Sequence, residues 1–319
     1  MAWLDMIPIL RSRKALAEAT RKLHTSASEL SALRAEALRQ QERLAKVKEK
    51  RRRLERRLHE SGSAGPARPL LVFEHIPKTA GTTFRRSYLI AALPSEERWI
   101  LAGGERNERD RERFLSQSPT ARARIRIVAG HDAEALRPHL PEARFITLVR
   151  DPIERVISSY LHARFHEGSG DLWADVRDRG MSLGEFAQKY IPTNAQSRIL
   201  LGDDHERLDV EQIRRRLTER YVLVGYTEAF DEFVYLLHQI EGLPLAMYGN
   251  RLVRAERESY VPSETDLESV RRSQSVDARL HQIVKEDFQS RVDAVPADSR
   301  ERLQQFLASL RAYRAGSKE

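Results

Sequence analysis

The segment Leu71–Phe84, with the sequence Leu-Val-Phe-Glu-His-Ile-Pro-Lys-Thr-Ala-Gly-Thr-Thr-Phe, joins a short apolar run to a polar loop. The loop is predicted to run into a helix, whose first N–H groups and partial positive charge form an anion site. Gly81 lets the backbone approach a phosphate closely, and Lys78 adds a mobile positive charge. The residues that we expect to hold the anion are Lys78, Thr79, Ala80, Gly81, Thr82 and Thr83.

The threonines of this loop add hydroxyl donors. The alternative interpretation is an ordinary strand–turn–helix connection with a threonine as the N-cap. One lysine and three threonines around a single glycine favour the anion site. The loop is not a Walker A motif, because that motif places its lysine directly after the second glycine, whereas Lys78 precedes Gly81. A kinase or an ATPase is therefore disfavoured.

A second segment, Phe145–Tyr160, places an arginine where a strand is expected to end. Asp151 can cap the helix that follows, and Pro152 suits its first turn. Arg150 thus lies at the carboxyl end of a strand, where open α/β sheets bind ligands. Ser158 is two turns further along and can reach the same crevice. An arginine fork and a serine hydroxyl suit a phosphate; for this segment alone, a surface pair of Arg150 with Asp151 is the simpler interpretation.

His131 is the histidine best placed to act as a general base. It follows Gly130 just after the predicted strand 125–128, so it also faces the crevice. An imidazole with an ordinary pKa near 6.5 accepts a proton at neutral pH. Asp132 or Glu134 could orient its ring, and the sequence does not decide between them.

Other polar residues near these segments have weaker claims. His75 is a rival base, but its place at the end of a strand favours packing. His162 and His166 are interpreted as groups at the rim of the site. Asn194, Gln196 and Arg198 either line an acceptor groove or cap the helix around Ile199.

The elements that must position these residues alternate between strands and helices, which predicts a parallel sheet covered by helices on both faces. We therefore expect an α/β fold with a P-loop-like parallel sheet. The predicted strands are 70–73, 125–128, 144–149 and 221–224, and the predicted helices are 84–93, 152–163, 230–240, 264–291 and 297–314.

Taken together, the two phosphate segments resemble the donor-binding motifs of sulfotransferases that use PAPS, the nucleotide carrying 5′-phosphosulfate and a 3′-phosphate. Two motifs are similar to those of the family-2 group, which includes the heparan sulfate 2-O-sulfotransferases. They are His-Ile-Pro-Lys-Thr-x-Gly-Thr and Arg-Asp-Pro-x-x-Arg-x-x-Ser-x-Tyr. The likeness continues through 194–198, 222–231 and 276–280, so it covers roughly residues 70–290.

The resemblance implies a function and roles for the site residues. The chain is expected to move a sulfuryl group from PAPS to a hydroxyl of a carbohydrate or glycolipid acceptor, releasing PAP and requiring no metal. Arg150 and Ser158 match the positions that hold the 3′-phosphate, and the loop at Lys78 matches the one that holds the 5′-phosphosulfate. His131 matches a base motif. Two positions depart from the family: Ala80 stands for a second glycine, and Ala129 for a histidine, which argues against glycosaminoglycan 2-O-specificity.

The N-terminal part differs in composition from the rest. Residues 1–62 hold 16 Lys+Arg and 8 Asp+Glu, whereas the remaining residues hold 39 of each, so the whole net charge of +8 comes from the N-terminal part. A heptad frame fits residues 16–58 with ten of thirteen seam positions apolar, which favours a coiled coil and a homo-oligomer. The predicted domains are a helical arm (1–62), a Gly/Pro-containing linker (63–69) and a catalytic domain (70–319). The balanced charge of the catalytic domain argues against a nucleic-acid partner.

Several classes are excluded or disfavoured by composition. The chain has no cysteine, so disulfides and thiolate catalysis are excluded. It has no apolar stretch long enough to span a bilayer and no secretory signal, so we expect a cytoplasmic protein with at most peripheral contact with the inner membrane face. The alternative from another class is a coiled-coil scaffold whose sulfotransferase-like domain binds the nucleotide without transferring the group.

Overall fold

The computed structural model describes residues 69–104, 106–166, 168–249 and 260–316. They all belong to one compact unit, residues 68–319. The predicted arm (1–62) and the predicted linker up to residue 68 lie outside the described residues, so the coiled coil and the homo-oligomer stay predictions. Among the described helices, none is both long and apolar enough to cross a membrane.

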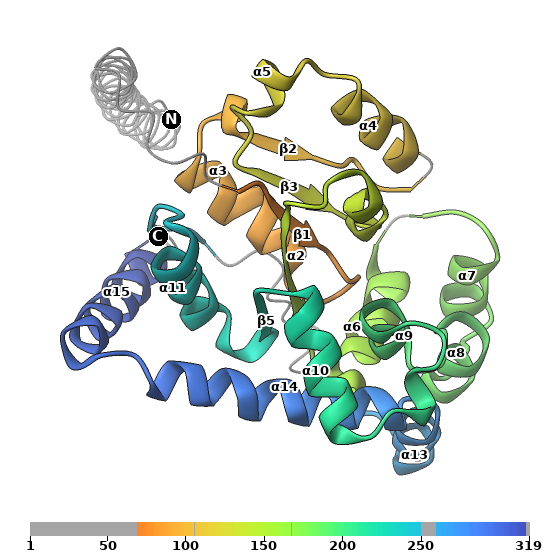
Figure 1. Cartoon of the computed structure of the whole chain (residues 1–319). Helices are drawn as coiled ribbons and strands as arrows, with labels where there is room; N and C mark the ends of the chain where they lie inside the picture. The colour runs from red at the N-terminus through yellow and green to blue at the C-terminus, as the bar shows by residue number, and fades with distance from the viewer. Residues whose placement is uncertain (1–68, 105, 167, 250–259, 317–319) are drawn as a thin grey trace, which may run out of the picture. The chain divides into compact units, whose positions relative to one another are not determined.

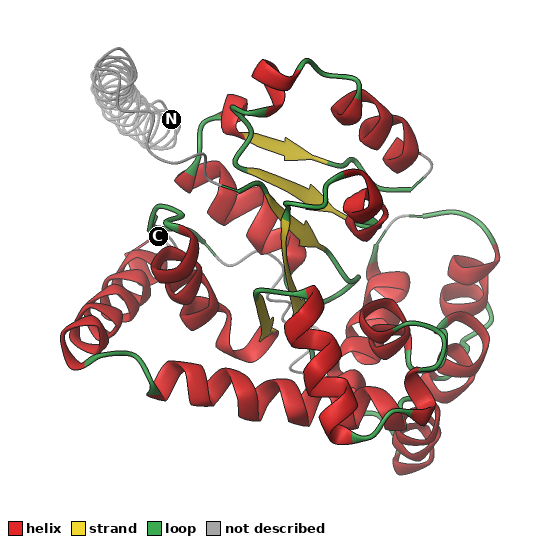
Figure 2. Cartoon of the chain, in the orientation of Figure 1, coloured by secondary structure: helices red, strands yellow, loops and turns green. Residues whose placement is uncertain are grey.

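The described elements alternate between strands and helices, as the sequence predicts (Figures 1 and 2). The strands are β1 (Leu71–Glu74), β2 (Arg98–Ile100), β3 (Ile127–Gly130), β4 (Arg144–Val149) and β5 (Leu223–Tyr226). The α-helices are α2 (Gly81–Thr83), α3 (Leu89–Ala92), α4 (Arg106–Leu115), α5 (Pro119–Arg122), α6 (Pro152–Phe165), α7 (Asp171–Trp173), α8 (Leu183–Tyr190), α9 (Ala195–Leu201), α10 (Val210–Arg220), α11 (Phe230–Glu241), α13 (Glu264–Ser273), α14 (Ser275–Asp293) and α15 (Ala297–Gly316). Two π-helical turns are η1 (Phe84–Tyr88) and η4 (Ala174–Asp178), and the 3₁₀ turns are η2 (Ser95–Glu97), η3 (Ala133–His139), η5 (His205–Arg207) and η6 (Thr227–Ala229).

The five strands form one parallel sheet in the order β2-β3-β1-β4-β5. In Figure 1, α4 and α5 lie beside β2 at one edge, and α10, α11 and α14 lie beside β5 at the other. All four residues of β1 are buried, as are the last five of β4, because helices cover a parallel sheet on both faces. The predicted parallel sheet flanked by helices is confirmed.

The predicted strand positions agree with the structure at β4 and differ from it at the other four strands. The prediction for β4 is correct at both ends, and that for β1 is one residue early. The observed β3 and β5 each begin and end two residues later than predicted, and both include a glycine, Gly130 and Gly225. Glycine has little intrinsic preference for strands, so the apolar run alone placed both strands too early. The short strand β2 has only half-buried residues and was not predicted.

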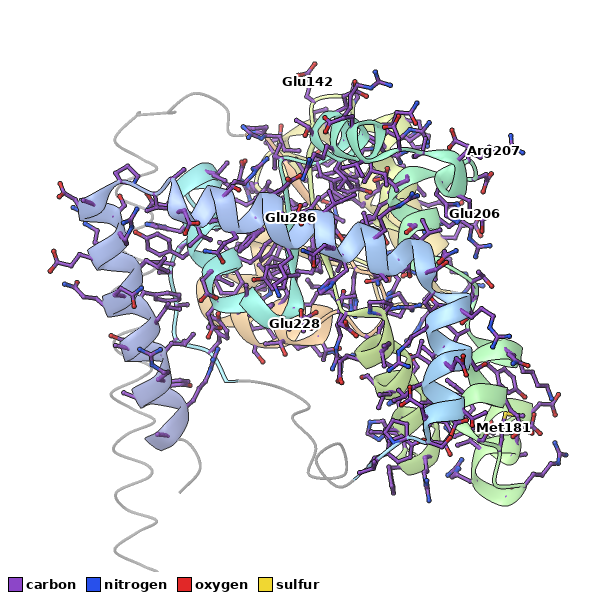
Figure 3. The ribbon with its side chains drawn as sticks, turned by 90° about the horizontal axis from the view of Figure 1, so that it is seen from below. Glu142, Met181, Glu206, Arg207, Glu228 and Glu286 are labelled. Atoms are coloured by element: carbon purple, nitrogen blue, oxygen red, sulfur yellow. The ribbon has the colours of Figure 1, made fainter. Side chains whose placement is uncertain are left out.

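The described residues pack into two hydrophobic clusters. The larger surrounds the sheet and includes Phe73, Phe84 and Phe145. The smaller lies between α6, α8 and α13 and includes Tyr160 and Phe186. Figure 3, viewed from below, shows α14 extending across the molecule from α15 to α13, with the labelled Met181 at the end where the smaller cluster lies.

The predicted helix 264–291 is in fact two helices, α13 and α14, which meet at Gln274. The backbone of Gln274 leaves the helical region, at φ −122° and ψ 28°. The next N–H groups, of Val276 and Asp277, donate to the side-chain oxygen of Asn194 at 3.0 and 3.3 Å. A cap from a distant segment therefore starts α14, and no local sequence pattern announces it.

Candidate functional site

The predicted site residues follow strands that are adjacent in the sheet. Glu74, the last residue of β1, is in register with Gly130 of β3 and with Thr147 of β4. The segments that begin at His75 and His131 therefore leave the same edge of the sheet, and Arg150 follows β4 at that edge. Parallel strands present their carboxyl ends together, so the sheet brings the loop, the histidine and the arginine into one region.

The loop after β1 has the backbone of an anion cradle. Lys78 and Ala80 both have positive φ, 70° and 60°, whereas Thr79 between them does not. Such an alternation turns successive N–H groups toward one side of a loop. Ala80 is the N-cap of the helix that runs unbroken from Gly81 to Ala92, and it supplies no side-chain cap. The helix therefore begins without a threonine N-cap, contrary to the ordinary strand–turn–helix interpretation.

The three threonines of the loop differ in their surroundings. The Thr79 hydroxyl is fully buried and donates to the Ile76 carbonyl at 2.9 Å, so the expected hydroxyl donor at Thr79 is wrong and only its backbone N–H remains for an anion. Thr82 is half-buried in the first helical turn, and Thr83 is buried beside it. The turn at Thr79 stiffens the loop from within.

Ala80 pays a conformational cost in the left-handed region that glycine avoids. We expect Ala80→Gly to raise the free energy of unfolding by about 1 kcal/mol, because an L-residue is strained at positive φ. Chemical denaturation of both proteins measures the difference. The matched control is Ala308→Gly at an exposed position inside α15, which should lower stability by about 1 kcal/mol. A loss of stability at both positions would show that residue 80 is not strained.

Gly81 and two histidines form a close-packed stack beneath the loop. A Cβ at Gly81 would lie 1.7 Å from Cδ2 of His75, so only glycine leaves room for that ring. The His75 ring is 4% exposed and stacks on His131 with ring centroids 4.0 Å apart. His75 is therefore a packing residue, as its place at the strand end predicts, and it links the anion loop to His131.

His131 is oriented by a backbone group. Its Nδ1 lies 2.6 Å from the carbonyl oxygen of His75, and because a carbonyl only accepts hydrogen bonds, Nδ1 carries the proton. The neutral ring then has its lone pair on Nε2. The sequence left open whether Asp132 or Glu134 orients the ring; in the structure the described partner of Nδ1 is the His75 carbonyl, while Asp132 accepts from the Asn107 side chain and Glu134 pairs with Arg137.

The surroundings keep both imidazoles neutral. Burial lowers the pKa of His131, and the positive charge of Arg85 lowers it further. Burial also lowers the pKa of His75 well below its ordinary value, and a protonated His131 and the positive charges of Arg85 and Lys78 act in the same direction. At neutral pH, His131 is therefore a neutral imidazole that can accept a proton.

The turn that carries His131 is held by residues that the sequence did not identify. The oxygens of the buried Glu74 carboxyl group accept from the N–H groups of Asp132 and Glu134 at 3.1 and 2.6 Å. Burial raises the pKa of Glu74 to about 8. The buried Asn107 side chain donates to the His131 carbonyl at 3.0 Å. Asn107 lies in no motif, and Glu74 lies in the Leu71–Phe84 segment without a predicted role, so the role of both residues follows only from the fold.

A cleft of about 550 Å³ opens beside this turn. Its lining mixes polar and apolar side chains and includes His131. The residues that line it are Glu74, His75, Pro77, His131, Asp132, Glu134, Ala135 and Ile199. A ligand in the cleft would thus meet His131 directly.

Arg150 reaches toward the anion loop from the neighbouring strand. Its Nη1 donates to the Lys78 carbonyl at 3.3 Å, and its Nη2 lies 3.5 Å from a carboxylate oxygen of Glu154. Asp151 caps α6, as predicted, and does not form the surface pair. Ser158 is half-buried and one turn beyond Glu154, so it lies on the same helix face. The structure thus brings Lys78, Arg150 and Ser158 to one region.

The remaining candidates lie elsewhere or have structural contacts. Asn194 and Gln196 are buried and do not line the cleft, whereas Arg198 is exposed. His162 and His166 contact each other with ring centroids 4.2 Å apart, at the opposite end of α6 from Arg150. Their interpretation as rim groups gains no support from that position.

Comparisons with known proteins identify a family and solved structures of similar proteins, two of which are described below. A family model described as "Sulfotransferase family" matches residues 8–210. A sulfotransferase from Alicyclobacillus acidocaldarius is similar at 16% identity, over 70% of this chain and 100% of that chain, with a TM-score of 0.36. Mouse sulfotransferase SULT7A1 complexed with PAP is similar at 14% identity, over 66% of this chain and 65% of that chain, with a TM-score of 0.33. No curated protein sequence matches the chain.

Proposed function

The chain belongs to the sulfotransferase family, and on this premise we propose that it transfers a sulfuryl group from PAPS to a hydroxyl of a carbohydrate or glycolipid acceptor, releasing PAP. The observation that carries the proposal is the neutral His131, held through Nδ1 by the His75 carbonyl and stacked against the ring that packs on Gly81. The proposed base and the anion loop therefore both pack against His75.

The donor's phosphates fit the residues at the carboxyl edge of the sheet. The alternation of φ at Lys78 and Ala80 and the uncapped helix start at Gly81 suit the 5′-phosphosulfate. Arg150 and Ser158 on the neighbouring strand and helix suit the 3′-phosphate, since an arginine fork matches phosphate oxygens. The two phosphate positions are then joined by the contact between Arg150 and the Lys78 carbonyl.

The transfer step needs one base and one cation. The acceptor oxygen forms a bond to sulfur as the bond between sulfur and the bridging phosphate oxygen breaks, and the acceptor proton passes to Nε2 of His131. The electron pair of the broken bond stays on the 5′-phosphate, where Lys78 stabilises the added charge. Such transfers have loose transition states, so positioning and electrostatics supply most of the catalysis.

The cleft beside His131 is the proposed acceptor site. None of its described lining residues is a lysine or an arginine, and three carry carboxyl groups: Asp132, Glu74, which burial keeps protonated at neutral pH, and Glu134, which pairs with Arg137 and Arg220. A polyanionic acceptor would find no lysine or arginine in this lining to offset its charge. The cleft therefore favours a hydroxyl on an uncharged sugar, which agrees with the departure at Ala129 from the 2-O-sulfotransferase pattern.

The test is transfer of label from ³⁵S-PAPS by the full-length protein. The acceptor panel contains neutral oligosaccharides, neutral glycolipids and an anionic glycosaminoglycan, and PAP release is followed in parallel. We expect label on a neutral acceptor in equal amount to the PAP released. If the protein binds PAP but labels none of the acceptors, the nucleotide-binding scaffold replaces the enzyme as the proposed function.

A further inference from the structure

Two sequence stretches that resemble the family without a role in the proposed function meet in the structure. They are 194–198, at the start of α9, and 276–280, at the start of α14. The carboxylate of Asp277 is fully buried and accepts from the N–H groups of Gln196 and Ser197 at 3.0 and 2.7 Å. In return, the side chain of Asn194 caps α14. Each helix thus receives its cap from the other, and we call this arrangement the reciprocal cap.

The side chain of Gln196 leaves the reciprocal cap and pairs with the backbone of Arg150. Its Oε1 accepts from the Arg150 N–H at 2.9 Å, and its Nε2 donates to the Arg150 carbonyl at 2.9 Å. The residue is fully buried, at 0% exposure. The amide therefore contacts both backbone polar groups of one residue, as a neighbouring strand would.

The place of this contact explains why it is needed. The ladder between β4 and β5 ends at the pair Val149–Tyr226, so Arg150 is the first residue without a strand partner on that side. An unpaired N–H and carbonyl at a partly buried position are costly. Gln196 extends the ladder by one residue and fixes the backbone from which the Arg150 side chain departs.

We propose that Gln196 is a positioning residue for donor binding: it fixes the backbone of Arg150 so that the guanidinium meets the 3′-phosphate, and the reciprocal cap fixes Gln196. The inference rests on the proposed function, because it takes Arg150 as a phosphate ligand. A positioning role for Gln196 differs from a purely structural role in one respect. Loss of its two hydrogen bonds to Arg150 changes the affinity for the donor in a protein that remains folded.

The decisive variant is Gln196→Glu, which keeps the size of the side chain. When the new carboxyl is ionised, one of its oxygens still accepts from the Arg150 N–H. Its other oxygen faces the Arg150 carbonyl oxygen, so two acceptors repel each other and that hydrogen bond is lost. When it is protonated, its O–H can donate to that carbonyl and restore the glutamine pattern. Burial raises the pKa of a carboxyl, so protonation occurs in mildly acidic solution.

The measurement is calorimetric titration of the full-length protein with PAP across a range of pH. We expect the Kd of Gln196→Glu to exceed that of the natural protein by about tenfold near pH 8 and by about twofold or less near pH 5.5. Taking the ratio to the natural protein at each pH removes the titration of the ligand's own phosphate. The exposed Gln188→Glu on α8 makes the same chemical change and should leave the ratio near one.

A second variant keeps the test decisive if the carboxyl prevents folding. Gln196→Met fills the same space but makes neither hydrogen bond, and we expect it to weaken PAP binding about tenfold at every pH. Wild-type affinity in Gln196→Met, or a Gln196→Glu ratio that is near one at pH 8 or does not change with pH, overturns the role of Gln196. Failure of the natural protein itself to bind PAP would instead overturn the proposed donor, and this inference with it.

Discussion

Replacing His131 with alanine should lower kcat by about 10²- to 10⁴-fold, because the acceptor proton then has no positioned base. The Kd for PAP should stay within about twofold, since the described contacts of His131 with the segment before the donor loop are made to His75, through its ring and its carbonyl. Initial rates with ³⁵S-PAPS and calorimetry with PAP measure the two quantities separately. The control is His139→Ala, an exposed histidine at the end of η3, which should change neither.

The pH dependence of the natural enzyme tests the same assignment. His131 must be neutral to accept a proton, and burial together with Arg85 holds its pKa below the ordinary 6.5. The enzyme should therefore keep its activity as the pH falls through 6.5 and lose it only at lower pH. Full activity of His131→Ala, or an acid limb centred above 6.5, would show that another group is the base.

Gly81→Ala should abolish both donor binding and turnover, with losses of at least about 100-fold in each. The new methyl would lie 1.7 Å from Cδ2 and 2.1 Å from Nε2 of His75. The His75 ring cannot move aside, since it is buried with Phe73 and His131 as ring neighbours. The loop must therefore shift, and with it the carbonyl that orients His131. Overpacking of this kind costs about 1–3 kcal/mol of stability.

Thermal unfolding, PAP calorimetry and initial rates together separate these effects for Gly81→Ala. The control is Gly316→Ala at the end of α15, where a Cβ meets no atom within 4 Å and all three quantities should stay unchanged. If Gly81→Ala kept both its PAP affinity and its turnover, the packing of His75 would not couple the loop to His131. If Gly81→Ala stayed as stable as the natural protein but lost PAP binding and turnover, the effect of the substitution would be confined to the site.

The sequence was informative where the decisive signal is local. The apolar run of β4 gave both of its ends, and Asp151 and Pro152 gave the start of α6, because strand propensity and helix capping act over a few residues. The loop at Lys78 was recognisable for the same reason. The left-handed backbone of Ala80 could not be predicted, because an alanine rarely adopts positive φ and its residue type gives no sign of it.

The partners of the site residues could not be predicted, because they come from distant parts of the chain. The group that orients His131 is the backbone carbonyl of His75, the residue after β1, and a carbonyl has no sequence pattern. Gln196 is 46 residues from Arg150, and its pairing depends on where β5 stops. The contacts of Asn107 and Glu74 with the turn at His131 could not be predicted from the sequence either. Tertiary packing assigns such residues their roles.

The two hydrophobic clusters give Arg150 a further significance. Arg150 and Asp151 are the only residues between β4, which belongs to the larger cluster, and α6, which packs in the smaller. A phosphate held by Arg150 and by the loop at Lys78 would bridge this junction. Helix α14 already contacts both α6 and β5, so on the proposed function a bound nucleotide adds a further contact across this junction, and its binding stabilises the folded protein by mass action.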